Sequence, residues 1–265
     1  GTGATNASDS NFLGRYAGNN ATGANNSNFI GSYAGQNASG AWGSNFFGPS
    51  AGQNAFSANN SNFLGNQAGV SASNANNSNF FGFSAGVGAS NASNSNFFGY
   101  QAGKNAFIAY NSNFFGVNSG NSAANASNSN FFGYSAGSGA TNAANAIFIG
   151  SYAGYNDTVN TGSTATAIAI GRYAGTGGFK DSIALGRGVI NSANNQANFS
   201  NILYLTGLTA SDTQSATPVA NGKVGIGTTS PVAALSVGLT SSVSIAGTTI
   251  PNLSASFTGS IISEK

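Results

Sequence analysis

A single motif recurs along the chain at a constant spacing of 17 residues, and this spacing limits the possible folds more than any other feature. In its commonest form the motif reads Ser-Asn-Phe-apolar-Gly-x-x-Ala-Gly, and nine copies follow one another without insertion or deletion. A constant period of this kind is typical of one structural unit stacked on itself. The first glycine of the motif, which we expect to close a strand and open a turn, recurs at Gly14, Gly31, Gly48, Gly65, Gly82, Gly99, Gly116, Gly133 and Gly150.

Two neighbouring columns of apolar residues precede these glycines. The column two residues before the glycine is Phe in every copy: Phe12, Phe29, Phe46, Phe63, Phe80, Phe97, Phe114, Phe131 and Phe148. The column directly before the glycine is apolar but varies in shape: Leu13, Ile30, Phe47, Leu64, Phe81, Phe98, Phe115, Phe132 and Ile149. Three other positions of the unit carry Ala almost without exception, which predicts a thin cross-section.

The repeat favours strands over helices. A 17-residue unit that contains two glycines and many Asn and Ser residues cannot sustain a helical apolar stripe. A short strand centred on Asn-Phe-apolar, a glycine, a turn at Ala-Gly and a return through Ala-rich segments would make one coil of a solenoid. We therefore expect an all-β fold, a parallel β-solenoid (β-roll) of 17-residue coils with a smaller β-rich C-terminal segment.

The two apolar columns also predict an assembly. Adjacent residues of a strand point to opposite faces, so one column must face outward from a thin coil. An outward column of Leu, Ile and Phe would exceed the apolar patch of a few hundred Å² that a soluble monomer usually exposes. Closed symmetry would cover it without open-ended growth, and we expect a homotrimer, with a dimer as the weaker alternative and end-to-end filaments as a further one.

The Asn residue before each Phe predicts a polar ladder, in which each side-chain amide bonds its equivalent one coil further along. The competing interpretation, that Asn merely tolerates turn geometry, carries equal weight for a single position. For the aligned column we favour the ladder: Asn11, Asn28, Asn45, Asn62, Asn79, Asn96, Asn113 and Asn130.

The regularity weakens after Gly154. We expect the regular solenoid over residues 1–155, irregular coils over 156–190, and a β-rich segment over 191–265 that is a candidate for joining subunits. In the last part Val243, Ile245 and Ile250 are typical of short strands, as are Phe257, Ile261 and Ile262.

Two resemblances follow from these residues. The segments Ala167-Ile-Ala-Ile-Gly171 and Ser182-Ile-Ala-Leu-Gly186 resemble the head repeats of trimeric autotransporter adhesins, which implies a trimer of parallel β-rolls. The unit Asn28-Phe-Ile-Gly-Ser-Tyr-Ala-Gly35, together with Val224-Gly-Ile-Gly-Thr-Thr-Ser-Pro231, is similar to bacterial surface proteins and phage tail fibres that carry a C-terminal intramolecular chaperone. The resemblance implies a surface fibre and no particular receptor.

Composition argues against several classes of function. Only 5% of residues are charged, and the seven basic residues are scattered, so the sequence predicts neither nucleic-acid binding nor membrane insertion. His and Cys are absent, and the acids Asp157, Asp181, Asp212 and Glu264 are far apart in the sequence. We expect a protein that is not an enzyme, with no catalytic residue, no metal site and no cofactor.

The function predicted from the sequence is a structural extracellular fibre or filament with an adhesive or stalk role, located at a cell surface or on a virion tail. Its expected partners are copies of itself and a cell-surface or carbohydrate receptor. Ice binding and carbohydrate binding are the alternatives, because flat solenoid faces of low charge can order water and exposed tyrosines can stack on sugars.

Overall fold

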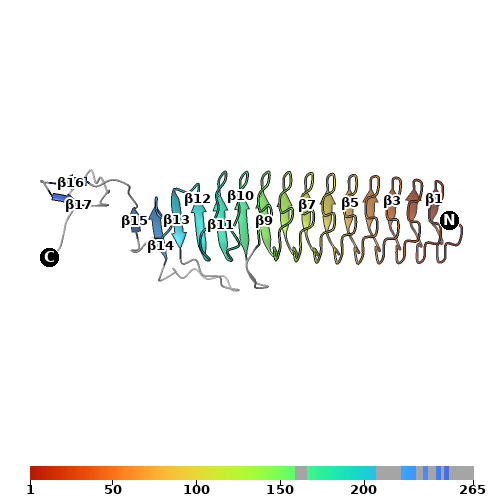
Figure 1. Ribbon diagram of the computed structural model, residues 1–265. Coiled ribbons are helices and arrows are strands. Elements are labelled where there is room, and N and C mark those ends of the chain that lie inside the picture. The colour runs from red at the N-terminus through yellow and green to blue at the C-terminus, as the bar shows by residue number, and fades with distance from the viewer. Residues whose placement is uncertain (159–165, 207–221, 231–234, 238–242, 246–247, 251–265) are drawn as a thin grey trace.

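The protein is an all-β solenoid whose coils follow one another in chain order along a rod (Figure 1). The computed structural model describes residues 1–158, 166–206, 222–230, 235–237, 243–245 and 248–250. Within these ranges every regular element is a strand. None of the described segments forms a helix with the length and apolar character needed to cross a lipid bilayer.

The first nine strands each lie in one copy of the sequence motif, and each pairs in parallel with the next. Their register follows the repeat, so that Phe80 lies beside Phe97 and Asn79 beside Asn96. This agreement confirms the predicted parallel β-solenoid of 17-residue coils. The strands are β1 (Asn11–Leu13), β2 (Asn28–Ile30), β3 (Asn45–Phe47), β4 (Asn62–Leu64), β5 (Asn79–Phe81), β6 (Asn96–Phe98), β7 (Asn113–Phe115), β8 (Asn130–Phe132) and β9 (Ala146–Ile149).

The same sheet continues through six more strands. Parallel pairing extends through β10 (Ala167–Ile170) and β11 (Ser182–Leu185) to β12 (Gln196–Phe199), which gives a solenoid of about eleven turns. The chain then reverses, because β13 (Leu203–Thr206) is antiparallel to both β12 and β14 (Lys223–Ile226). The last strand of the sheet, β15 (Leu235–Val237), is again parallel to its neighbour.

A separate two-stranded sheet contains β16 (Val243–Ile245) and β17 (Thr248–Ile250), which are antiparallel and pair with each other. The predicted strand residues Phe257, Ile261 and Ile262 lie outside the described residues. The parallel coils run past residue 190, where the sequence suggested a change, and the domain limits at 155 and 190 stay predictions.

The core is a stack of phenylalanine rings lined by alanines. From Phe29 to Phe148 each ring of the inner column is fully buried, and successive centroids lie 4.7–4.9 Å apart with the rings nearly parallel. The three Ala columns are buried around this stack. Ala is the residue that fits because the interior of each coil holds one ring and leaves room only for methyl groups.

Two polar features fix how one coil lies on the next. The buried Ser78 hydroxyl donates to the Ala92 carbonyl at 2.6 Å and accepts from the Ser95 amide at 3.1 Å, and this arrangement recurs from coil to coil. Gly82, one of the nine turn glycines, has φ of +136°, and a Cβ there would lie 2.4 Å from the Gly99 carbonyl oxygen. The turn therefore needs glycine for its backbone angle and for close stacking.

Candidate functional site

The outward face of the sheet carries an unbroken apolar stripe. It begins with the column that directly precedes the turn glycines and, by strand register, continues into β10 and β11. Leu13 is 67% exposed, and Phe47, Phe132 and Ile170 are 37–38% exposed. We call this set the outer stripe: Leu13, Ile30, Phe47, Leu64, Phe81, Phe98, Phe115, Phe132, Ile149, Ile170 and Leu185.

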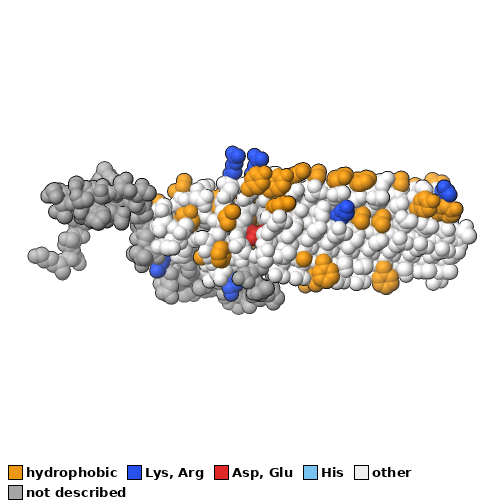
Figure 2. Space-filling model, in the orientation of Figure 1, with side chains coloured by type: hydrophobic (Ala, Val, Ile, Leu, Met, Phe, Trp, Pro, Cys, Tyr) orange, Lys and Arg blue, Asp and Glu red, His pale blue; other side chains and the backbone are white. Residues whose placement is uncertain are grey.

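Aromatic contacts organise the middle of the outer stripe. Phe98 and Phe115 stack at 4.8 Å, and Phe115 and Phe132 stack at 5.1 Å, whereas Phe81 meets Phe98 edge to face at 4.6 Å. Each ring therefore covers part of its neighbour and leaves its outer edge in solvent. Charged side chains are sparse on the face drawn in Figure 2, where hydrophobic side chains follow one another along one long edge of the rod.

An asparagine ladder runs beside the outer stripe on the same face. The Nδ2 of each Asn donates to the Oδ1 of the Asn one coil further along, at 2.8 Å from Asn79 to Asn96 and 2.9 Å from Asn113 to Asn130. The structure brings together every member of the predicted column from Asn11 to Asn130. From Asn28 onward these residues are half-buried, and the hydrogen bonds hold their amide groups in one orientation.

The inner column takes no part in any surface, because its rings are enclosed from Phe29 to Phe148. Phe12, in the first coil, is partly buried and stacks on Phe29 at 5.2 Å. The nine turn glycines lie directly after the strands with φ between +128° and +140°. These two sets shape the coil, and the outer stripe and the asparagine ladder face outward.

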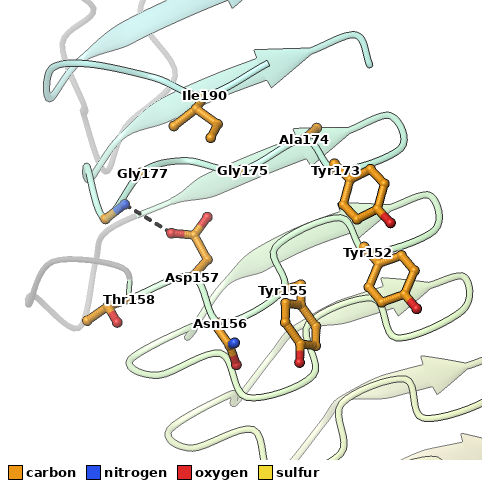
Figure 3. A pocket seen from close by; sticks show the side chains of 11 residues that line it. Tyr152, Tyr155, Asn156, Asp157, Thr158, Tyr173, Ala174, Gly175, Gly177 and Ile190 are labelled. Atoms are coloured by element: carbon orange, nitrogen blue, oxygen red, sulfur yellow. Dashed lines mark hydrogen bonds between the residues drawn. The ribbon is translucent and has the colours of Figure 1, made fainter. Parts of the chain in front are cut away.

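A hollow opens where the coil length changes (Figure 3). The step between corresponding strand residues is 21 residues from β9 to β10 and 15 from β10 to β11. The hollow has a volume of about 470 Å³. It lies between the segment that follows β9 and the shorter coil that follows β10. Its lining residues are Tyr152, Tyr155, Asn156, Asp157, Thr158, Tyr173, Ala174, Gly175, Gly177, Gly178 and Ile190.

Asp157 occupies a position that belongs to the core from the second coil onward. It follows Ala140 by one period, and the residues at this position from Ala21 to Ala140 are buried. Asp157 is only 7% exposed, and its carboxylate accepts hydrogen bonds from the Thr176 amide, the Thr176 hydroxyl at 2.9 Å and the Gly178 amide at 3.0 Å. It thereby holds the turn of the shorter coil in place.

Three tyrosines form one wall of the hollow. Tyr152 stacks on Tyr173 at 4.9 Å, and Tyr155 stands nearly perpendicular to Tyr152 at 5.5 Å. A hydrogen bond with Tyr134, followed by burial and the neighbouring phenols, raises the pKa of Tyr152 above its ordinary value of 10.0.

Sequence reasoning named the outer column and the asparagine column but not this hollow. The signal was present, because Asp157 stands 17 residues after Ala140 in a column that is otherwise Ala. The acids considered together do not form one site: Asp181 accepts a hydrogen bond from the Thr166 amide at 3.1 Å, and Asp212 and Glu264 lie outside the described residues.

The fold and its ladders define the class of this chain as a parallel β-solenoid repeat protein, and they are compatible with a structural role. No known protein family and no curated protein matches the sequence. The class therefore rests on the coil register, the ring stack and the ladders themselves.

Proposed function

We propose that this chain forms the body of an extracellular structural fibre or filament, with an adhesive or stalk role and no catalysis, and that it associates with copies of itself through the outer stripe. The observation that carries the proposal is the outer stripe, an apolar line over eleven successive strands. A surface of this length is costly to leave in water.

The size of the outer stripe suits a stable interface. An aromatic side chain presents about 150–250 Å² when fully exposed. A third of such an area at each strand amounts to roughly 700 Å² of apolar surface per chain. This is close to the ~800 Å² that each partner contributes to a standard protein interface.

The geometry of the outer stripe favours a closed assembly. It follows a stack of strands in constant register, so a second rod can lie along it over its whole length. Three rods around one axis would turn all three stripes inward and leave none exposed, which ends the association. The half-buried asparagine ladder would border the apolar contact with groups already satisfied among themselves.

The mass of the purified chain tests the homotrimer. Sedimentation equilibrium is expected to give about three times the 26.1 kDa of one chain. The double variant Phe98→Ser, Phe115→Ser interrupts the outer stripe and should shift the mass toward one chain. The matched control is Phe56→Ser, Phe107→Ser, because these phenylalanines are 56% and 49% exposed but lie outside the stripe. A mass equal to one chain at all concentrations would contradict the proposed interface. A mass equal to two chains would show a dimer in place of the trimer.

The extracellular location and the adhesive role are supported by the resemblance of the repeats to surface fibres and by the low charge. Immunogold labelling of intact source cells or particles tests the location. Label confined to the cell interior would contradict it. Retention of particles on a surface coated with the purified chain tests adhesion, with an unrelated solenoid of similar size as the control.

Ice binding is not favoured by the surface that would have to perform it. The outward hydroxyl column through Thr22, Ser39, Ser73 and Ser90 is interrupted by Phe56, and later by Phe107. A flat hydroxyl row is thus broken after a few coils. Thermal hysteresis should equal that of the buffer.

A further inference from the structure

We propose that the hollow formed by Tyr152, Tyr155, Asp157, Tyr173 and Ile190 binds an organic cation, namely an alkylammonium or alkylguanidinium group. The site uses no residue of the outer stripe, so the proposal does not depend on the assembly described above. Figure 3 shows the tyrosines and Asp157 on neighbouring coils, with Ile190 across the opening from Asp157.

Asp157 is a buried acid without a basic partner among the described residues. Asp157 is 7% exposed, and the groups that donate to its carboxylate are two amides and one hydroxyl. These donors orient the carboxylate but carry no net charge, and no Lys or Arg among the described residues forms an ion pair with it. A buried charge is costly unless an opposite charge accompanies it. A cation in the hollow would supply that charge.

The aromatic wall of the hollow is partly exposed to solvent. Tyr155 and Tyr173 are 49% and 47% exposed, and the perpendicular Tyr152 and Tyr155 rings make a corner. Aromatic ring faces attract ammonium and guanidinium groups. The chain itself already makes such contacts, because the Arg172 guanidinium carbon lies 5.0 Å from the centroid of Tyr173. The Arg172 guanidinium therefore covers part of the Tyr173 ring. The ring surface that stays free for a ligand is the corner between Tyr152 and Tyr155.

The tyrosine stack ends at this coil. By strand register Gly188 occupies the position after Tyr173, and an added Cβ at Gly188 would meet nothing within 4 Å. Tyr173 covers the ring of Tyr152, but no ring of the next coil covers Tyr173 in turn. The face of Tyr173 is open because Gly188 carries no side chain that could cover it.

The size and remaining lining of the hollow fit a small ligand group. About 470 Å³ lies in the range of small-molecule sites. Asn156, Thr158 and the glycine backbone are neutral, and Ile190 can contact an alkyl chain. A neutral sugar could also stack on the tyrosines, but it would leave the charge of Asp157 uncompensated.

Calorimetric titration of the full chain with butylguanidinium tests the proposal, with butanol and glucose as neutral probes. Butylguanidinium is expected to bind, and the neutral probes are not. The capped peptide Gly-Arg-Gly distinguishes the source of the cation: binding at least as tight as butylguanidinium indicates a basic side chain of a partner protein, and clearly weaker binding indicates a free small molecule.

Variants assign the binding to this hollow. Asp157→Asn should weaken butylguanidinium binding at least tenfold, and Tyr155→Leu by about threefold to tenfold, whereas Tyr155→Phe keeps the ring face and the affinity. Tyr100→Leu is the matched control, because Tyr100 is 47% exposed and stacks on Phe83 without a carboxylate in a hollow beside it. The exposed Tyr155 can be changed without disturbing the turn that Asp157 holds, so its variants decide the question if Asp157→Asn unfolds the coil.

Three results would overturn the proposal. They are the absence of butylguanidinium binding to the folded chain, binding of glucose or butanol as tight as that of the cation, and cation binding that Tyr155→Leu leaves unchanged. None of these bears on the trimer, because the mass measurement and the outer-stripe variants are read separately.

Discussion

Several positions in each of the first nine coils adopt a left-handed backbone, and one of them holds Asn74 and its equivalents. Asn74, Asn91 and Asn125 have φ of 50–52° there, and Ile108 occupies the same position with φ of 51°. Asn tolerates this conformation, but a β-branched residue does so at a cost of about 1–2 kcal/mol. Ile108 also interrupts a second line of amides, because Asn74 donates to Asn91 and Asn125 donates to Asn142, each at 2.9 Å.

Ile108→Asn is therefore expected to stabilise the fold. The substitution relieves the backbone strain and lets an amide join Asn91 to Asn125, while it loses the contacts of a half-buried apolar side chain. We expect a net gain of about 1 kcal/mol in the free energy of unfolding. Denaturant unfolding measures it, with Ile108→Val as a control that keeps the β-branch and brings no gain. A loss of stability in Ile108→Asn would show that side-chain contacts outweigh the strain.

The pKa of Tyr152 gives a second prediction for a single residue. The hydrogen bond with Tyr134 raises this pKa above 10.0, so the folded chain favours the neutral phenol. The resulting stability is fully present below pH 10 and is lost as the pH rises through the higher pKa of the folded state. Tyrosinate absorbance should detect a late-titrating phenol, which Tyr134→Phe moves back toward the ordinary value. The control Tyr100→Phe should leave the late titration in place.

At the level of the strand, adjacent residues have opposite roles. In β6 the Phe97 ring is fully buried between Phe80 and Phe114, whereas Phe98 lies in the outer stripe. Phe97→Ala opens a cavity in the ring stack and should cost about 3–5 kcal/mol. Phe98→Ala removes a partly covered ring without opening an enclosed cavity and should cost less, about 1–2 kcal/mol, in a dissociated chain. Thermal unfolding of both variants at low protein concentration compares them, and equal losses would contradict the inward and outward assignment.

The strands were predictable because each is encoded locally and repeated in register. An Asn-Phe-apolar triplet followed by Gly specifies a strand, its buried face and its end, as β1 to β8 confirm. The hollow was not predictable in the same way. It depends on two changes of coil length and on the hydrogen bonds that the Asp157 carboxylate accepts from Thr176 and Gly178. The reversal at β13 was missed for a similar reason: an apolar run such as Ile202 to Leu205 specifies a strand but not its direction.

At the level of the whole molecule, each described coil of the repeat contacts mainly its two neighbours. Ring stacking, the asparagine ladder and the serine bonds all join residues of adjacent coils. The stability of such an array is approximately a sum of coil terms and of terms for neighbouring pairs. The length of the rod is then set by the number of coils and not by any one of them.

Deletion of residues 83–99 tests this account, because it removes one full period and joins Gly82 to Tyr100. The strand of the next coil then meets β5 in an unchanged register, Phe114 stacks on Phe80, and Asn79 donates to Asn113. We expect the same circular dichroism per residue and a rod shorter by about 4.8 Å. Deletion of residues 83–91 alone is the matched control: it removes about half a period, separates the ring column from its partner and should abolish cooperative unfolding. If both deletions were equally harmful, the coils would not be independent units, and the stability of the rod would have to come from contacts longer than one period.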